Sequence, residues 1–156
     1  DKWAKLKVLN LKNCRSLQTI GEKPSLKSVE SLDLSHVPAA HVETILAHLS
    51  EALSLTTLRL GSAELTSLQP LARLTSLKQL SISFAPNLTD LSGVEQLTLL
   101  QSLWLSHGKA LTDLTPLTAH PTLKKLTLKS TFGTRPLSKA KCKPLSTIAG
   151  LEYTIT

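Results

Sequence analysis

One short pattern, Leu-x-x-Leu-x-Leu, recurs through the middle of the chain and constrains its fold more than any other feature. Copies begin at Leu55, Leu77, Leu100 and Leu123, so successive copies are 22, 23 and 23 residues apart, with Ile82 as the only replacement of a leucine. A fixed period in this range indicates a solenoid, in which each repeat buries its apolar side against its neighbours. We therefore predict one elongated domain over residues 1–156.

Weaker copies of the pattern extend the array in both directions. They begin near Leu6, Val29 and Leu151, so the repeats start near positions 6, 29, 55, 77, 100, 123 and 151. The interval before Leu55 is longer, at 26 residues. Its extra length holds apolar residues at helical spacing, which predicts an α-helix near 41–53: Val42, Ile45, Leu46, Leu49 and Leu53. The shorter repeats have room only for turns or 3₁₀ segments there.

Alternation within each copy predicts the layout of the sheet. If the leucines point inward, the residues between them face the opposite, concave side of a parallel β-sheet. The expected fold class is an α/β solenoid: an arc of about six or seven short strands, with a convex side made mostly of turns and 3₁₀ helix and one α-helix. Pairing Leu151 with Leu123 would place Tyr153 and Ile155 on the concave face.

The sequence also resembles a known class of repeats. The segments SLDLSHV, LTDLSGV and LWLSHGKALTDLTPL resemble the roughly 23-residue leucine-rich repeats common in trypanosomatid proteins. Ser31 to His36 matches the strand half of that repeat, and Leu111 to Leu117 matches the outer half. The repeats are also similar to those of internalins, without their asparagine ladder. The resemblance implies protein binding and no shared catalytic residues.

The concave columns contain one group of side chains suited to binding a partner. Most concave positions are small and polar, but Trp104 is a tryptophan expected to face solvent on a rigid sheet, which is the composition of a binding hot spot. Alternatively, Trp104 is an ordinary surface aromatic that packs on its neighbours. The predicted partner-binding residues are Arg59, Gln79, Phe84, Trp104, His107 and Lys125.

A cluster of cations near the C-terminus suggests a second class of function. The formal net charge is +7, and seven Lys and Arg residues fall within positions 124–143 without an acid among them. Such a cluster would attract RNA or an acidic protein surface, as in a structural subunit of a ribonucleoprotein or other anionic assembly. It could also be a solvated face that aids solubility. The candidate anion-binding residues are Lys124, Lys129, Arg135, Lys139, Lys141 and Lys143.

Other classes of function find no support in the sequence. No glycine-rich phosphate loop or motif around a serine, histidine and carboxylate set is present, and the histidines lie too far apart for zinc, so we expect no enzyme, cofactor or metal. No run is apolar enough to span a membrane. Two cysteines at opposite ends, Cys14 and Cys142, favour a reducing intracellular compartment, the cytoplasm or an organelle. We expect the chain to be part of a longer array.

Overall fold

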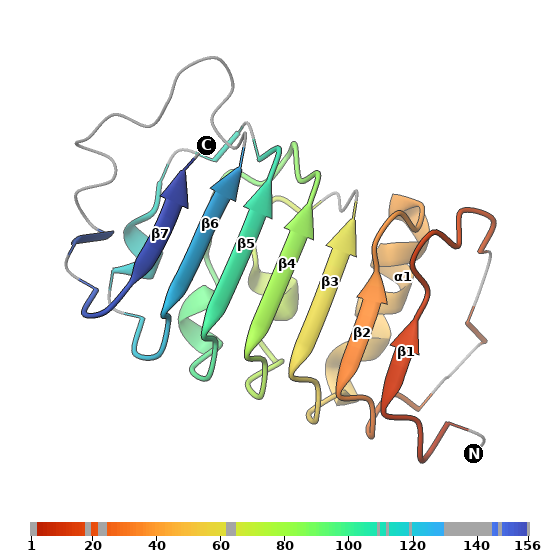
Figure 1. Cartoon of the computed structure of the whole chain (residues 1–156). Coiled ribbons are helices and arrows are strands. Elements are labelled where there is room, and N and C mark those ends of the chain that lie inside the picture. Colours follow the sequence, from red (N-terminus) through yellow and green to blue (C-terminus); the bar gives the residue numbers. More distant parts are fainter. Residues whose placement is uncertain are drawn as a thin grey trace.

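The computed structural model contains one parallel sheet that runs the length of the molecule (Figure 1). It describes residues 3–17, 20–21, 25–61, 65–108, 110–111, 113–118, 120–129, 145–146 and 148–155. In this part of the chain, seven parallel strands lie side by side in sequence order. The strands are β1 (Val8–Asn10), β2 (Ser31–Leu34), β3 (Thr57–Gly61), β4 (Gln79–Ser83), β5 (Ser102–Ser106), β6 (Lys125–Lys129) and β7 (Glu152–Ile155).

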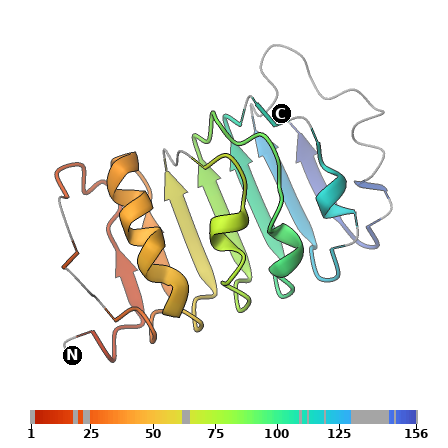
Figure 2. The same ribbon diagram turned by 180° about the vertical axis from the view of Figure 1, so that it is seen from behind.

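Helical segments cover the opposite side of the sheet (Figure 2). The predicted helix is confirmed as α1 (Ala39–His48), which continues into the 3₁₀ segment η1 (Leu49–Glu51). Leu53, which the spacing assigned to this helix, follows η1 and is exposed. The shorter repeats carry single 3₁₀ turns, as predicted: η2 (Gln69–Leu71), η3 (Val94–Gln96) and η4 (Thr115–Leu117). The chain is therefore a leucine-rich-repeat solenoid with a concave sheet and a convex side of turns and one α-helix.

The core is a ladder of leucines between these two sides. Leu58, Leu80, Leu103 and Leu126 are consecutive members in register, and each is at most 1% exposed. Burying one such side chain contributes about 1.5–3 kcal/mol relative to leaving it in water. The same burial recurs in successive repeats, so the inward leucines determine which residues face the concave side.

Backbone hydrogen bonds hold the repeats at a constant offset. The carbonyl of Thr56 accepts from the N–H groups of Lys78 and Gln79 at 2.8 and 2.9 Å, and the same arrangement recurs at the start of other strands. On the convex side, Ser67, Asp90 and Asp113 occupy equivalent positions, and the side chain of each accepts a hydrogen bond from the backbone N–H two residues later. Hydrogen bonds from Ser92 lower the pKa of Asp90 below its ordinary value, so this convex carboxylate is charged at neutral pH.

The register of the last strand differs from the prediction by one residue. β7 pairs with β6 so that Tyr153 lies beside Leu126 and Ile155 beside Leu128. Tyr153 and Ile155 therefore take inward positions, whereas the sequence analysis placed them on the concave face. This register directs Ile155 toward the core, against which it packs, and leaves Thr154 rather than an apolar residue on the concave column.

A buried histidine occupies a position that holds a leucine in the two preceding repeats. His120 stands where the two preceding repeats have Leu74 and Leu97, and it is 5% exposed. Its Nε2 lies 3.1 Å from the carbonyl oxygen of Leu97, and its Nδ1 accepts a hydrogen bond from the N–H of Thr122. Nε2 therefore carries the proton and donates to Leu97. Burial lowers the pKa of His120 below its ordinary value of 6.5, against smaller opposing contributions from the carbonyls of Leu97 and Val94.

We predict that His120 makes the fold sensitive to acid. Below about pH 6.5 the unfolded chain takes up a proton at His120 that the folded chain does not, so stability falls as the pH falls. Replacing His120→Leu restores the residue of the neighbouring repeats and should reduce this loss. Urea unfolding of both proteins at pH 8 and pH 5 measures this loss of stability. Equal losses in the two proteins would exclude His120 as the cause.

We predict that Gly93→Ala destabilises the fold through both its backbone and its surroundings. Gly93 has a φ of 100°, and an added Cβ would lie 2.7 Å from the backbone of Leu68 and Gln69. Gly21 has the same φ of 100° with nothing within 4 Å, so Gly21→Ala measures the conformational cost alone. We expect losses of about 2–4 kcal/mol for Gly93→Ala and about 1–2 kcal/mol for Gly21→Ala. Equal losses in thermal unfolding would contradict the close contact.

Candidate functional site

Three of the predicted partner-binding residues line one hollow on the concave face. Arg59 on β3, Gln79 on β4 and Trp104 on β5 surround a volume of about 170 Å³. Ser81 forms its floor, because the register places this small residue between Arg59 on one side and Trp104 on the other. Parallel strands lie about 4.8 Å apart, so two long side chains stand about 10 Å apart across a short one. The hollow follows directly from this order of side chains.

Asp33 positions the guanidinium group at the edge of the hollow. It lies beside Arg59 in register, and its Oδ2 is 3.7 Å from Nη1 of Arg59. Its other oxygen, Oδ1, accepts a hydrogen bond of 2.9 Å from the N–H of Ser35, which fixes the carboxylate. The Asp33 side chain is 13% exposed, whereas that of Arg59 is 58% exposed. Arg59 is therefore oriented by the sheet and still open to a partner.

Phe84 and His107 form a second pair at the carboxyl ends of β4 and β5. Their ring centroids are 5.5 Å apart at an interplanar angle of 44°. Both residues have a positive φ, of 64° and 56°, as do Asn13 and His36 at the equivalent positions of earlier repeats. This conformation is uncommon for residues other than glycine and unfavourable for a bulky one such as phenylalanine. Phe84 is nevertheless 53% exposed.

Backbone hydrogen bonds keep this pair in place. The N–H of Phe84 donates to the carbonyl of Ser106 at 3.0 Å, and the N–H of His107 donates to that of Lys129 at 3.0 Å. The buried hydroxyl of Ser106 also lies 3.1 Å from Nδ1 of His107. Residues held in sparsely populated φ/ψ regions are often found at functional sites. The pair is thus a fixed, solvent-exposed aromatic surface at the end of the strands.

The lysines of the C-terminal half lie beside this site. Lys125 is exposed on β6, next to Ser102 in register, and so borders the hollow without lining it. Lys124 and Lys129 are exposed at the two ends of the same strand. The other candidate anion-binding residues, Arg135, Lys139, Lys141 and Lys143, lie outside the described residues. The described part of the basic cluster therefore lies on β6 and immediately before it.

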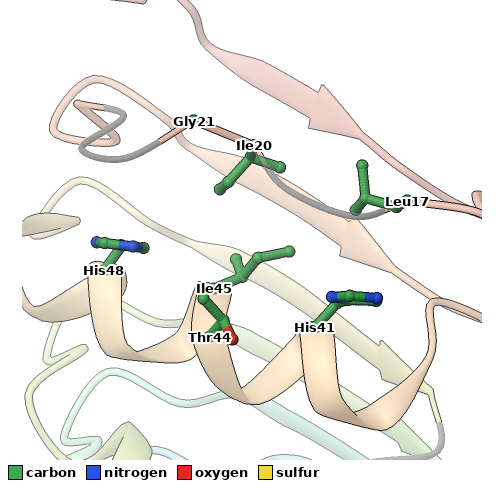
Figure 3. Close-up of a pocket in the computed structure, with 7 residues that line it drawn as sticks. All are labelled: Leu17, Ile20, Gly21, His41, Thr44, Ile45 and His48. Carbon is green, nitrogen blue, oxygen red and sulfur yellow. The ribbon is translucent and has the colours of Figure 1, made fainter.

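A smaller cavity lies between the first repeat and α1 (Figure 3). Leu17 and Ile20 face Ile45, with His41 and His48 toward its two ends. Its volume is about 20 Å³, which is room for about one water molecule. Among the described residues, no three His, Cys, Asp or Glu side chains gather as metal ligands would. None of the helices described here has the length and apolar character needed to span a membrane.

Two features of the site were not predicted from the sequence. The first is the role of Asp33 as the residue that positions Arg59. The second is the left-handed backbone at Phe84 and His107, because neither residue type signals a turn. The repeat spacing could have shown it, since Asn13, a residue that tolerates this conformation, occupies the equivalent position of the first repeat.

Comparison with known proteins supports the fold. The structure is similar to that of internalin C2 from Listeria monocytogenes, with a TM-score of 0.56, 25% identity, and coverage of 97% of this chain and 71% of that one. It is also similar to internalin F from the same organism, with a TM-score of 0.52, 23% identity, and coverage of 96% and 46%. No protein-family model and no curated protein sequence matches the chain.

We predict that Phe84 is not required for stability. Phe84→Asn should leave the free energy of unfolding unchanged or raise it by up to about 1 kcal/mol, because asparagine tolerates the left-handed conformation. Phe84→Ala removes the ring and keeps the unfavourable backbone, so it should be less stable than Phe84→Asn. Chemical unfolding of the three proteins tests this. A loss of more than about 1 kcal/mol in Phe84→Asn would show that the ring supports the fold.

Proposed function

We propose that this chain is a non-catalytic scaffold that binds a partner protein on the concave face of its leucine-rich-repeat sheet. The observation that carries the proposal is the hollow in which Arg59, Gln79 and Trp104 converge. Tryptophan and arginine are the residue types most enriched where interfaces concentrate their binding energy. The similarity to leucine-rich-repeat proteins of the internalin type is consistent with an interaction scaffold.

The size of the hollow favours a protein over a small molecule. Sites for small ligands typically enclose about 300–1,000 Å³ and cover most of the ligand. The concave hollow has a volume of about 170 Å³, and polar side chains such as Gln79 and Ser102 line much of it. It is suited to one side chain of a larger partner, with the surrounding strands making further contacts.

The remaining candidate residues extend the proposed interface beyond the hollow. Phe84 and His107 would contact the partner at the carboxyl ends of the strands, and Lys125 would contact it on β6. Trp104 would be the anchor, because it is partly buried against the sheet and presents its remaining surface at the hollow. Because the strands are held in the sheet, little backbone ordering of this chain opposes binding.

The alternative, docking of an anionic assembly through the basic end, has less support. Of its six candidate residues, the described ones are Lys124 and Lys129, and no observation on the described residues points to nucleic acid. The relation to trypanosomatid repeats also stays a prediction. Protein binding on the concave face is therefore the better supported of the two functions.

The proposal is tested by replacing the anchor. Trp104→Ala should weaken binding of a partner isolated from native lysate by about 2 kcal/mol or more, which is about thirtyfold in Kd. The partner is captured on the immobilised protein with and without nuclease and identified by mass spectrometry. Its affinity for each variant is then measured by calorimetry.

A matched control is available away from the sheet. Leu53 is 60% exposed and follows the convex helix, so Leu53→Ala removes a large apolar side chain outside the proposed interface. It should leave the affinity unchanged. Equal affinities of Trp104→Ala and the unmodified protein, with both folded, would refute the concave site. Loss of all captured protein after nuclease treatment would instead favour RNA and the basic end.

A further inference from the structure

Charge is distributed unequally between the two faces of the central repeats. From β3 to β6 the strands carry the cations Arg59, Lys125 and Lys129 and no carboxylate. Lys78 and Lys124 add two exposed cations immediately before β4 and β6. Two carboxylates flank this region in register: Asp33 on β2 lies beside Arg59, and Glu152 on β7 lies beside Lys125. Because five cations stand against these two carboxylates, the concave surface around the hollow carries a net positive charge.

The described acids of the same repeats lie on the convex side, where each has a local role. Asp90 accepts from the N–H of Ser92 at 2.6 Å, and Asp113 accepts from the N–H of Thr115 at 2.8 Å. Glu95 accepts from the N–H of Gly93 at 2.9 Å. These carboxylates complete hydrogen-bonded turns on the convex side. They cannot neutralise the concave cations, which the leucine core separates from them.

We infer that the concave site binds an acidic, extended segment of the partner protein, with carboxylates toward Arg59 and Lys125 and an apolar side chain against Trp104. This inference rests on the proposed function and specifies the chemistry of its partner. Opposite charges on two contacting surfaces raise the association rate and select among partners. The apolar side chain fills the hollow beside the indole, where it excludes water from the ionic contacts.

The spacing of the strands sets the spacing of the ligand groups. Arg59 on β3 and Lys125 on β6 are three strands apart, which is about 14 Å at 4.8 Å per strand, and the register offsets them by two residues along the strands, so the diagonal is about 16 Å. An extended chain advances about 3.4 Å per residue, so a segment crossing the strands diagonally covers this distance in about four to five residues. Trp104 on β5 lies between the two cations. The expected pattern is two acidic residues about four positions apart, with an apolar residue between them.

Arg59 can bind a carboxylate of the partner in addition to Asp33. A guanidinium group carries five N–H donors, and the 3.7 Å contact with Asp33 involves Nη1. A second carboxylate can approach the exposed part of the group in the paired geometry that arginine favours. Asp33 therefore acts as a positioning residue that orients Arg59 along the sheet.

Two synthetic peptides test the inference. Each has nine residues, a central phenylalanine and blocked ends. One carries glutamate two positions to either side of the phenylalanine, and the other carries glutamine there. Fluorescence anisotropy of the labelled peptides should show that the glutamate peptide binds at least about tenfold more tightly at low salt, with the difference falling as salt rises.

Variants of two arginines distinguish binding of the peptide at the concave site from its nonspecific attraction to a basic protein. Arg59→Gln should remove most of the preference for glutamate. Arg73→Gln removes the same charge from an exposed position after η2 on the convex side, and should leave the preference unchanged. Equal effects of the two variants, or equal binding of the two peptides, would overturn the inference.

The outcomes for the proposed function and for this inference are distinguishable. If Trp104→Ala abolishes binding of the captured partner while both peptides bind equally, the concave site stands and the acidic specificity is wrong. If single-stranded oligouridylate displaces the glutamate peptide and binds more tightly in an Arg59-dependent manner, the surface recognises nucleic acid and the inference is also wrong.

Discussion

The leucine ladder is the contact on which the rest of this structure depends. Leu58, Leu80, Leu103 and Leu126 are fully buried and in register, and each repeat gains its stability by covering the one before it. Because successive side chains of a strand point to opposite faces, fixing the leucines also fixes every concave side chain. The hollow beside Trp104 therefore exists because a serine happens to separate two long side chains on a sheet that the leucines hold rigid.

Most of the fold could be predicted because the period of the sequence is the period of the structure. Strands β1 to β6, α1 and the 3₁₀ turns lie at the repeat positions that the leucine spacing predicted. The prediction failed at β7, where the pattern degrades and the preceding interval is longest. Two alignments of that strand fit the sequence, and the structure adopts the one that turns Ile155 rather than Thr154 toward the core.

Less of the candidate site could be predicted, since it depends on contacts between strands and on backbone conformation. Alternation identified Arg59 and Trp104 as concave, and the register then brought them to one hollow. The role of Asp33 depends on where its second oxygen is held, which no spacing reveals. The left-handed backbone at Phe84 is set by the loop between repeats and opposes the preference of the residue itself.

Oxidative footprinting of the isolated complex with its partner protein tests the concave site most directly. Hydroxyl radicals modify exposed side chains, so the comparison of free and bound protein maps the covered face residue by residue. The account predicts protection of Trp104, Phe84 and His107, with the exposed Leu53, in the turn between η1 and β3, unchanged. Protection of Leu53 with Trp104 and Phe84 still modified would place the partner away from the concave site and contradict the account.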